Sequence, residues 1–397
     1  MSGADSRAGQ EGTGIYIHVP FCRRKCPYCD FYSLPCPGVG MGGERRSGQT
    51  PLPDRYTDAL IRCMEEMAAR YPLTQADSLY IGGGTPTLLG SQRLNRLLEA
   101  ACRCFGSGLL KGEVTLEANP GTVELDQLRQ LRRGGFNRIS FGVQSAVEEE
   151  LESLGRIHSF SQAAGAVRAA AAAGFDNLSV DLMLGIPGQT PDSALRSVDA
   201  CLQLPIRHLS AYLLKVEEGT PFARMGIAGR CPDEELSADI YEAVSSRLEA
   251  GGLRRYEISN FAQPGYESRH NLKYWLSAPY LGLGPSAHSF VEGRRLFFPR
   301  DLEGFVSSAQ PLSLLREEES PETTGTPEEF IMLGLRLTQG ISMEELARRY
   351  PGFDREGFLR RARELERYGL CTVGERIALT GRGFLLSNGV TVRLLGE

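Results

Sequence analysis

Hydrophobic positions follow two alternating patterns through the first half of the chain. Short runs rich in β-branched and aromatic residues alternate with segments whose apolar residues recur every three or four positions. The runs predict strands at 14–19, 78–81, 113–116, 138–141, 178–183 and 208–213. The intervening segments predict helices at 53–70, 91–104, 124–134, 161–173 and 191–202. This alternation is typical of parallel sheets, and six repeats indicate an α/β fold, a partial (β/α)6 barrel.

Changes in this pattern divide the chain into segments. A polar tail at 1–13 is predicted to be disordered, and the partial barrel occupies 14–235. A β-rich extension with many aromatic residues follows at 236–306, and a polar Glu/Pro/Thr-rich stretch at 307–326 is predicted to be a linker. Within the barrel, the Gly/Pro-rich stretch 37–53 indicates a loop. Residues 327–397 read as helices followed by a hairpin, which predicts a small helical, winged-helix-like domain.

Composition narrows the classes of protein. The 397 residues carry a formal net charge of −5, which gives no electrostatic reason to expect a nucleic-acid partner. The N-terminus lacks the apolar segment of a secretory signal, and no apolar run is long enough for a transmembrane helix. We therefore expect a cytoplasmic protein, whose ten cysteines are not disulfide-bonded. Six scattered cysteines are interpreted as small buried apolar residues: Cys63, Cys102, Cys104, Cys201, Cys231 and Cys371.

Three cysteines form a tight cluster in the run HVPFCRRKCPYCDFYS. Cys22, Cys26 and Cys29 have the spacing CxxxCxxC. Thiolates suit zinc or iron–sulfur clusters, but zinc usually takes four ligands and no second cysteine pair lies nearby in the sequence. Three thiolates on one loop hold three irons of a [4Fe-4S] cluster and leave the fourth open to the amino and carboxylate groups of S-adenosylmethionine. Cys36 is not expected to be a fourth ligand, because a closed cluster would lose that site.

Polar residues and glycines stand at the ends of the next predicted strands. The second strand ends in GGGTP, residues 82–86, the third leads to Glu117, the fourth to Gln144, and the fifth carries Asp181. Glycines let the backbone approach a ligand closely, and carboxyl ends of parallel strands converge. Glu117 or Asp181 taken alone is equally well explained as a helix cap. The consecutive set favours one shared site.

The cysteine motif resembles that of the radical S-adenosylmethionine superfamily. The stretches YIHVPFC, GGGTP, EANPGT, GFNRISFGVQS, LGRIH and DLMLGIPGQT resemble the oxygen-independent coproporphyrinogen III oxidase (HemN) family over nearly the whole chain. This resemblance implies a set of S-adenosylmethionine contacts: Tyr16, Gly83, Gly84, Thr85, Glu117, Gln144, Arg156 and Asp181.

Two branches of that family differ at residues that can be identified in this chain. By this resemblance, the oxidases have four cysteines with the spacing CxxxCxxCxC and an N-terminal extension before the first strand. This chain instead has Phe31 at the position of the fourth cysteine, and only a short polar tail precedes its first predicted strand. CPYCDF, HNLKYW at 270–275 and GLGPSAHSF resemble the HemW branch of haem chaperones. Imidazole is a haem ligand and aromatic rings offer flat apolar surface. Candidate haem residues are therefore His270, Tyr274, Trp275 and His288.

Three functions remain open from the sequence. The resemblance favours a haem chaperone that binds a [4Fe-4S] cluster, S-adenosylmethionine and haem b as cargo, and passes haem to an acceptor protein. The alternatives are an oxygen-independent coproporphyrinogen III oxidase (dehydrogenase) and a HemN-like radical methyltransferase. Each needs an electron donor, such as flavodoxin or ferredoxin, for the cluster. No catalytic residue is assigned.

Overall fold

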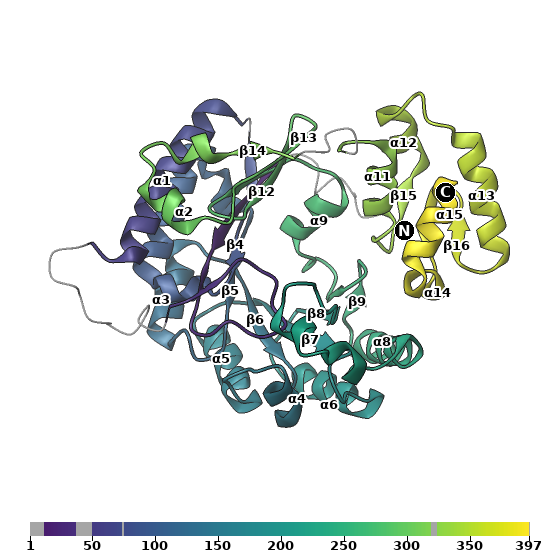
Figure 1. Ribbon diagram of the computed structural model, residues 1–397, viewed down its shortest axis with the longest axis horizontal. Helices are drawn as coiled ribbons and strands as arrows, with labels where there is room; N and C mark the ends of the chain where they lie inside the picture. The colour runs from purple at the N-terminus through teal and green to yellow at the C-terminus, as the bar shows by residue number, and fades with distance from the viewer. Residues whose placement is uncertain (1–11, 37–49, 74, 319–323, 397) are drawn as a thin grey trace.

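The computed structural model describes residues 12–36, 50–73, 75–318 and 324–396. Its centre is one curved sheet with helices packed along its outer face (Figure 1). Within the described residues the sheet has 12 strands, in the order β14-β13-β12-β11-β1-β4-β5-β6-β7-β8-β10-β9. Residues 1–11 of the tail predicted at 1–13 and most of the predicted loop at 37–53 lie outside the described residues, whereas Thr13 already belongs to the first strand.

Six parallel strands form the middle of the sheet and confirm the predicted α/β partial barrel. They are β1 (Thr13–Val19), β4 (Ala76–Gly83), β5 (Glu113–Ala118), β6 (Arg138–Gln144), β7 (Asn177–Leu184) and β8 (His208–Leu213). Their residues are largely buried along the whole strand, as expected when a parallel sheet is covered on both faces. All six carboxyl ends therefore meet at one edge, where the site lies.

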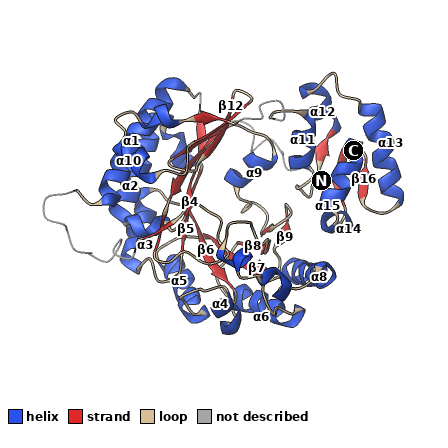
Figure 2. Ribbon diagram, viewed as in Figure 1, coloured by secondary structure: helices blue, strands red, loops and turns tan. Residues whose placement is uncertain are grey.

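Helices connect these strands and cover the outside of the sheet (Figure 2). They are α1 (Leu52–Arg70), α2 (Ser91–Phe105), α3 (Leu125–Gly134), α4 (Glu148–Ser153), α5 (Phe160–Ala172), α6 (Pro191–Leu202) and α8 (Glu234–Ala250). Their boundaries follow capping chemistry: Ser159 accepts from the backbone N–H of Gln162, and Gln162 bonds back, which begins α5. One large apolar core joins the helices to the sheet.

Both edges of the sheet are extended by strands that the sequence did not resolve individually. Next to β1, β11 (Tyr280–Leu283) pairs in parallel, and β12 (His288–Val291), β13 (Arg294–Phe297) and β14 (Arg316–Glu317) continue antiparallel. Next to β8, β10 (Asn260–Ala262) and β9 (Arg254–Arg255) are also antiparallel. The extension predicted at 236–306 is therefore split between the two edges of the sheet.

Part of the predicted linker is ordered structure. Within 307–326, the described residues include a 3-10 helix at Pro311–Leu314 and the strand β14. The backbone N–H of Leu312 donates to Glu66 on α1 at 2.8 Å, and Leu312, Leu314 and Leu315 pack against the main core. The linker prediction was wrong for these residues, because the few leucines among many polar residues bind the segment to α1.

The C-terminal residues form a small second unit with its own core. It comprises α11 (Pro327–Gly334), α12 (Met343–Arg349), α13 (Arg355–Arg367), α14 (Gly381–Leu385) and α15 (Ser387–Leu395), with β15 (Ile341–Ser342), β16 (Cys371–Val373) and β17 (Arg376–Leu379) in a small antiparallel sheet. This unit joins the barrel through a backbone bridge between Glu257 and Leu337. Among the described residues, no helix has the length and apolar character needed to span a membrane.

The helix α9 (Arg269–Trp275) lies between the sheet and the C-terminal unit (Figure 1). It contains the HNLKYW segment and is held by buried charges. Glu113 accepts from the backbone N–H groups of Arg269 and His270 at 2.9 and 3.1 Å. Lys273, which is 1% exposed, lies 2.8 Å from Asp77 and donates to the carbonyl of Gly12. These contacts fix α9 against the amino ends of β1, β4 and β5.

Candidate functional site

The three cysteines of the CxxxCxxC motif lie over the carboxyl ends of the parallel strands. Cys22 ends β2 (Phe21–Cys22), and Cys26 and Cys29 follow in the loop. All three line a cavity of about 590 Å³. Predicted residues that share its lining are Gly83, Gly84, Glu117, Gln144, Arg156 and Asp181. We call this space the cluster cavity.

Polar groups surround the cysteine sulfurs in the way that thiolates require. Thr85 Oγ1 donates to Cys22 Sγ and Arg156 Nη1 donates to Cys26 Sγ, both at 3.6 Å. Burial raises the pKa of the Cys22 and Cys29 thiols, and iron binding offsets that burial because it stabilises the thiolate form. The site thus offers three free thiols as iron ligands, and two side chains donate hydrogen bonds to their sulfurs. This arrangement fits a [4Fe-4S] cluster with one open iron.

Two glycines at the end of β4, Gly83 and Gly84, allow the cysteine loop to pack against the strand. A Cβ atom on Gly84 would lie 2.6 Å from the carbonyl oxygen of Phe21 and 3.1 Å from Cys22 Sγ. Gly83 has φ +109°, and a Cβ atom there would lie 2.6 Å from the ring of His18. A side chain at Gly84 would therefore displace the start of the cysteine loop, and one at Gly83 would displace His18 on β1.

Two carboxylates face the cluster cavity from β5 and β7. Glu117 accepts from Tyr80 Oη at 2.7 Å and from the backbone N–H of Gly83 at 3.0 Å. Burial raises the pKa of Glu117 to about 7. Asp181 accepts from Ser140 Oγ at 3.0 Å, and burial likewise raises its pKa. A bound cation, such as an ammonium or a sulfonium, would stabilise the ionised form of both carboxyl groups.

Arg156 and Asn119 connect the cysteine loop to the strand ends. Arg156 Nη2 donates to Asn119 Oδ1 at 2.5 Å and to the carbonyl of Gly142 at 2.6 Å. Asn119 Nδ2 in turn donates to Thr85 Oγ1 at 2.7 Å. Gln144 has φ +70° at an irregularity in β6, a strained backbone that is typical of functional sites. Sequence reasoning missed Asn119, although it stands in the quoted motif EANPGT.

Four further residues line the cluster cavity but were not assigned to S-adenosylmethionine or the cluster as ligands, although three of them stand in the quoted motifs around the cysteines, GFNRISFGVQS and HNLKYW. They are Tyr28, Tyr80, Arg138 and Asn271. Tyr16, by contrast, was predicted to contact S-adenosylmethionine but does not line the cluster cavity. Its hydroxyl forms a hydrogen bond with His18 Nδ1 at 3.0 Å, and its side chain lines a second cavity.

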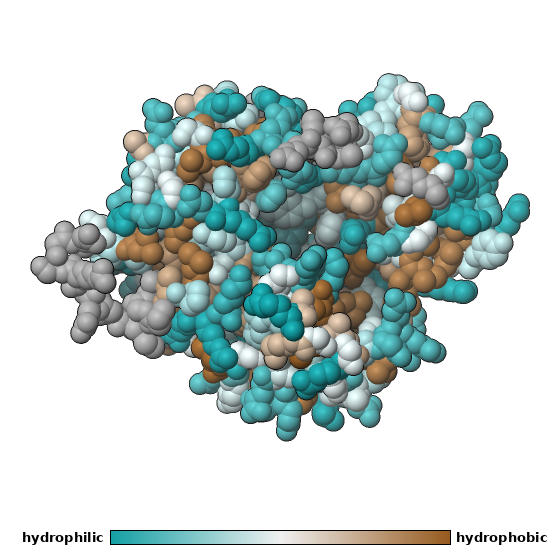
Figure 3. All heavy atoms as spheres, in the orientation of Figure 1, coloured by the Kyte–Doolittle hydropathy of each residue, from teal (hydrophilic) through white to brown (hydrophobic). Residues whose placement is uncertain are grey.

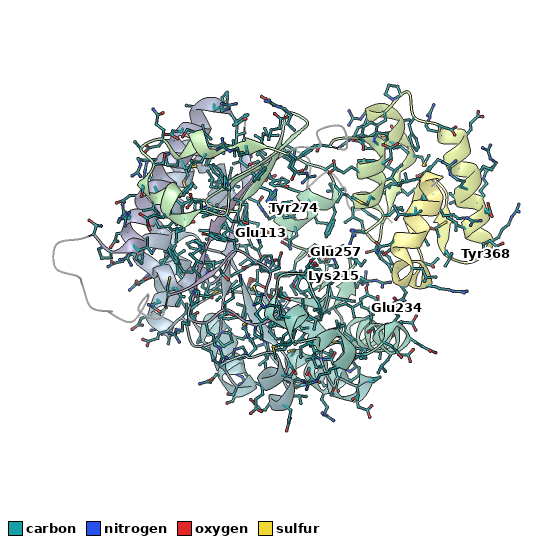
Figure 4. All side chains as sticks on the ribbon, viewed as in Figure 1. Glu113, Lys215, Glu234, Glu257, Tyr274 and Tyr368 are labelled. Carbon is teal, nitrogen blue, oxygen red and sulfur yellow. The ribbon has the colours of Figure 1, made fainter. Side chains whose placement is uncertain are left out.

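This second cavity, of about 510 Å³, lies between β1, α9 and the β12–β13 hairpin. We call it the aromatic cavity, because rings dominate its lining: Tyr16, His18, Phe31, Tyr32, Tyr274, Tyr280, His288 and Phe290. Arg295 and Arg300 also line it, each paired with an acidic lining residue, Glu329 and Asp30 respectively. Ser277 and Ser286, which also line it, have φ of +49° and +68°. Figure 4 shows Tyr274 between the sheet and the C-terminal unit, and Figure 3 shows a hollow between these parts.

The four candidate haem residues separate in the structure. Tyr274 and His288 line the aromatic cavity. His270 is 0% exposed, and its Nδ1 and Nε2 form hydrogen bonds with Ser78 Oγ at 3.0 Å and Tyr274 Oη at 2.9 Å. Both ring nitrogens of His270 are occupied within the fold, so neither is presented to a haem iron. Trp275 lies under the guanidinium of Arg336, 5.6 Å from the ring centre, at the contact with the C-terminal unit.

Comparison with protein families matches residues 16–201 to the Radical SAM superfamily and residues 326–386 to the HemN C-terminal domain. The fold and the cysteine site thus define a radical SAM protein, whose class implies an iron–sulfur cluster and S-adenosylmethionine. The structure of coproporphyrinogen III oxidase (HemN) from Escherichia coli superposes with a TM-score of 0.77 at 23% identity, over 98% of this chain and 92% of that chain. This likeness shows the fold.

Curated relatives define the family more narrowly. Heme chaperone HemW of Mycobacterium tuberculosis (strain ATCC 25618 / H37Rv) is 37% identical over 96% of this chain and 95% of its own length. Heme chaperone HemW of Bacillus subtilis is 36% identical over 96% of this chain and 99% of its own length. Heme chaperone HemW of Escherichia coli is 37% identical over 83% of this chain and 84% of its own length. The chain belongs to the HemW family.

Proposed function

We propose that this protein binds haem in the aromatic cavity, holds a [4Fe-4S] cluster and S-adenosylmethionine in the cluster cavity, and passes haem to an acceptor protein. The observation that carries the proposal is the aromatic cavity itself. It has an imidazole, flat rings and two arginines in one space of about 510 Å³, within the size range of small-molecule sites. The printed names of the curated relatives support haem as the ligand.

His288 is the imidazole best placed to bind the haem iron. Its Nδ1 lies 3.3 Å from Glu318 Oε1, and its ring stacks on Phe297 with centroids 5.7 Å apart. A carboxylate on one ring nitrogen orients an imidazole and raises the basicity of the other. The proposal therefore assigns the iron to Nε2 of His288.

Tyr274 and Arg300 complete the proposed haem site. The Tyr274 ring packs edge-on against Tyr280, with centroids 4.6 Å apart, and this fixes an apolar wall. Arg300 is 57% exposed and forms a long ion pair with Asp30 at 3.5 Å, so a haem propionate can replace that partner at little cost. Arg295 is already bound to Glu329 at 2.5 Å and is less available.

In the cluster cavity, Cys22, Cys26 and Cys29 would hold the cluster. Glu117 and Asp181 would bind the positive groups of S-adenosylmethionine, and Arg156 would keep the cysteine loop against the strand ends. A reduced cluster supplies the electron for reductive cleavage of a bound sulfonium, and an electron donor such as flavodoxin or ferredoxin would provide it.

The test compares haem binding with oxidase chemistry in one preparation. Protein with a reconstituted cluster is titrated with ferric haem, and is separately incubated anaerobically with coproporphyrinogen III, S-adenosylmethionine and a reductant. The proposal predicts saturable haem binding near one per chain and no protoporphyrinogen. Conversion of coproporphyrinogen without haem binding would overturn it and favour the oxidase; formation of a methylated product would favour the methyltransferase.

A further inference from the structure

Asp30 and Phe31 are the residues common to the linings of the cluster cavity and the aromatic cavity. They follow Cys29 directly in the chain, so the wall between the two cavities belongs to the loop that carries the three cysteines. Asp30 turns toward Arg300, with Oδ2 3.5 Å from Nη2. The phenyl ring of Phe31 is therefore the apolar part of this shared wall.

The backbone that carries Phe31 is held from both sides. Lys25 Nζ donates to the carbonyl of Phe31 at 3.1 Å, and the imidazole of His18 bonds to the carbonyl of Tyr32 at 2.8 Å. The backbone N–H of Cys29 donates to the carbonyl of Cys26 at 3.1 Å. These bonds hold the backbone of the loop, so Phe31 is carried at the boundary between the cavities.

The side chain of Phe31 is unusually open for a residue at a fixed position. It is 66% exposed, although its neighbours in the aromatic cavity, such as Tyr274 and His18, are half-buried or buried. An exposed phenyl gains free energy when a flat apolar ligand covers it. A tetrapyrrole between Tyr274 and His288 would supply such a surface, with its propionates directed to Arg300.

We propose that Phe31 is the partition between the two sites: its ring covers one edge of the bound tetrapyrrole and keeps that edge out of the cluster cavity. This inference rests on the proposed haem function and deepens it. Removal of the ring would join the two cavities. Tetrapyrrole and S-adenosylmethionine, which bind independently in the intact protein, would then compete for the joined space.

The test uses full-length protein with an oxidised, reconstituted cluster, so that no turnover occurs. Metal-free protoporphyrin IX is the probe, because its binding depends on the walls of the cavity and not on an iron ligand. Phe31→Ala is compared with Phe31→Leu and with Tyr368→Ala. Tyr368 is a matched control because it is also an exposed aromatic residue, at 64%, but lines neither cavity. Iron content and thermal unfolding verify that each variant is intact.

We expect Phe31→Ala to bind protoporphyrin about three- to tenfold more weakly than the wild type, Phe31→Leu to lose less, and Tyr368→Ala to be unchanged. Saturating protoporphyrin should leave the Kd for S-adenosylmethionine unchanged in the wild type and raise it in Phe31→Ala. If Phe31→Ala matches Tyr368→Ala, or loses porphyrin affinity without this competition, the partition is overturned. If wild-type protein binds neither haem nor protoporphyrin, the proposed function itself fails.

Discussion

His270 Nε2 and the hydroxyl of Tyr274 form a hydrogen bond of 2.9 Å within one turn of α9. The bond ties a fully buried imidazole to a ring that lines the aromatic cavity. Burial lowers the pKa of His270 to about 3, so this imidazole stays neutral and structural. The first histidine of HNLKYW thus positions the tyrosine of the same motif.

From this relationship, His270→Ala should destabilise the fold without changing the kind of haem ligation. The substitution leaves Ser78 Oγ without a buried partner and opens space beside Gly14, so we expect a loss of about 2–3 kcal/mol in the free energy of unfolding. Denaturant unfolding measures this loss. The absorption spectrum of bound haem should keep its wild-type band positions; a changed ligation spectrum would instead show that His270 binds the iron.

The buried ion pair beneath α9 makes a second prediction. Lys273→Ala leaves the carboxylate of Asp77 without its cation and should cost about 3–5 kcal/mol of stability. Lys215→Ala is a matched control, because Lys215 pairs with Glu217 at 2.9 Å but its side chain is 81% exposed. That substitution should cost less than about 1 kcal/mol in the same unfolding experiment. Equal losses in the two variants would show that α9 is not anchored by this pair.

Arg156 should be needed for the cluster cavity rather than for the fold alone. Arg156→Lys keeps the charge but loses the forked geometry that reaches Asn119, Gly142 and Cys26 together. We expect S-adenosylmethionine to bind at least about tenfold more weakly to the reconstituted protein, measured by equilibrium dialysis. Arg168→Lys on the exposed face of α5 is the control and should bind normally. Unchanged binding in Arg156→Lys would remove Arg156 from the site.

Much of this arrangement could be predicted from local pattern, and the remainder depends on contacts between distant residues. Short apolar runs predicted the six parallel strands, and motif spacing predicted the three cysteines. Tyr16 was assigned from the family resemblance, which does not show which of the two cavities its side chain lines. That depends on β11, which pairs with β1 from more than 260 positions away. The partners of His270 and His288, namely Ser78 and Glu318, are likewise set by tertiary contact and leave no signal in a single sequence.

Glu257 makes stability depend on pH at the junction with the C-terminal unit. It is fully buried, accepts from Ser259 N–H and Asn260 Nδ2, and burial raises its pKa from 4.5 to about 7. Between pH 4.5 and about pH 7, Glu257 is protonated in the folded protein but ionised in the unfolded chain. Its contribution to the free energy of unfolding therefore falls as the pH rises through this range. Glu257→Gln should remove that fall and stabilise the protein at pH 8 by up to about 3 kcal/mol.

The control for that experiment is Glu242→Gln, an exposed glutamate on α8. Thermal or denaturant unfolding from pH 5 to 8 should give parallel profiles for Glu242→Gln and the wild type. A Glu257→Gln profile with the wild-type slope would show that Glu257 is ionised in the folded protein throughout this range.

The central claim, that haem lies in the aromatic cavity with His288 on its iron, is tested most directly by titrating ferric haem into wild-type protein and His288→Ala while recording the Soret band. We predict saturation near one haem per chain for the wild type, and for His288→Ala a shifted Soret maximum with affinity at least about tenfold weaker. Identical band positions and affinities in the two proteins would contradict the account.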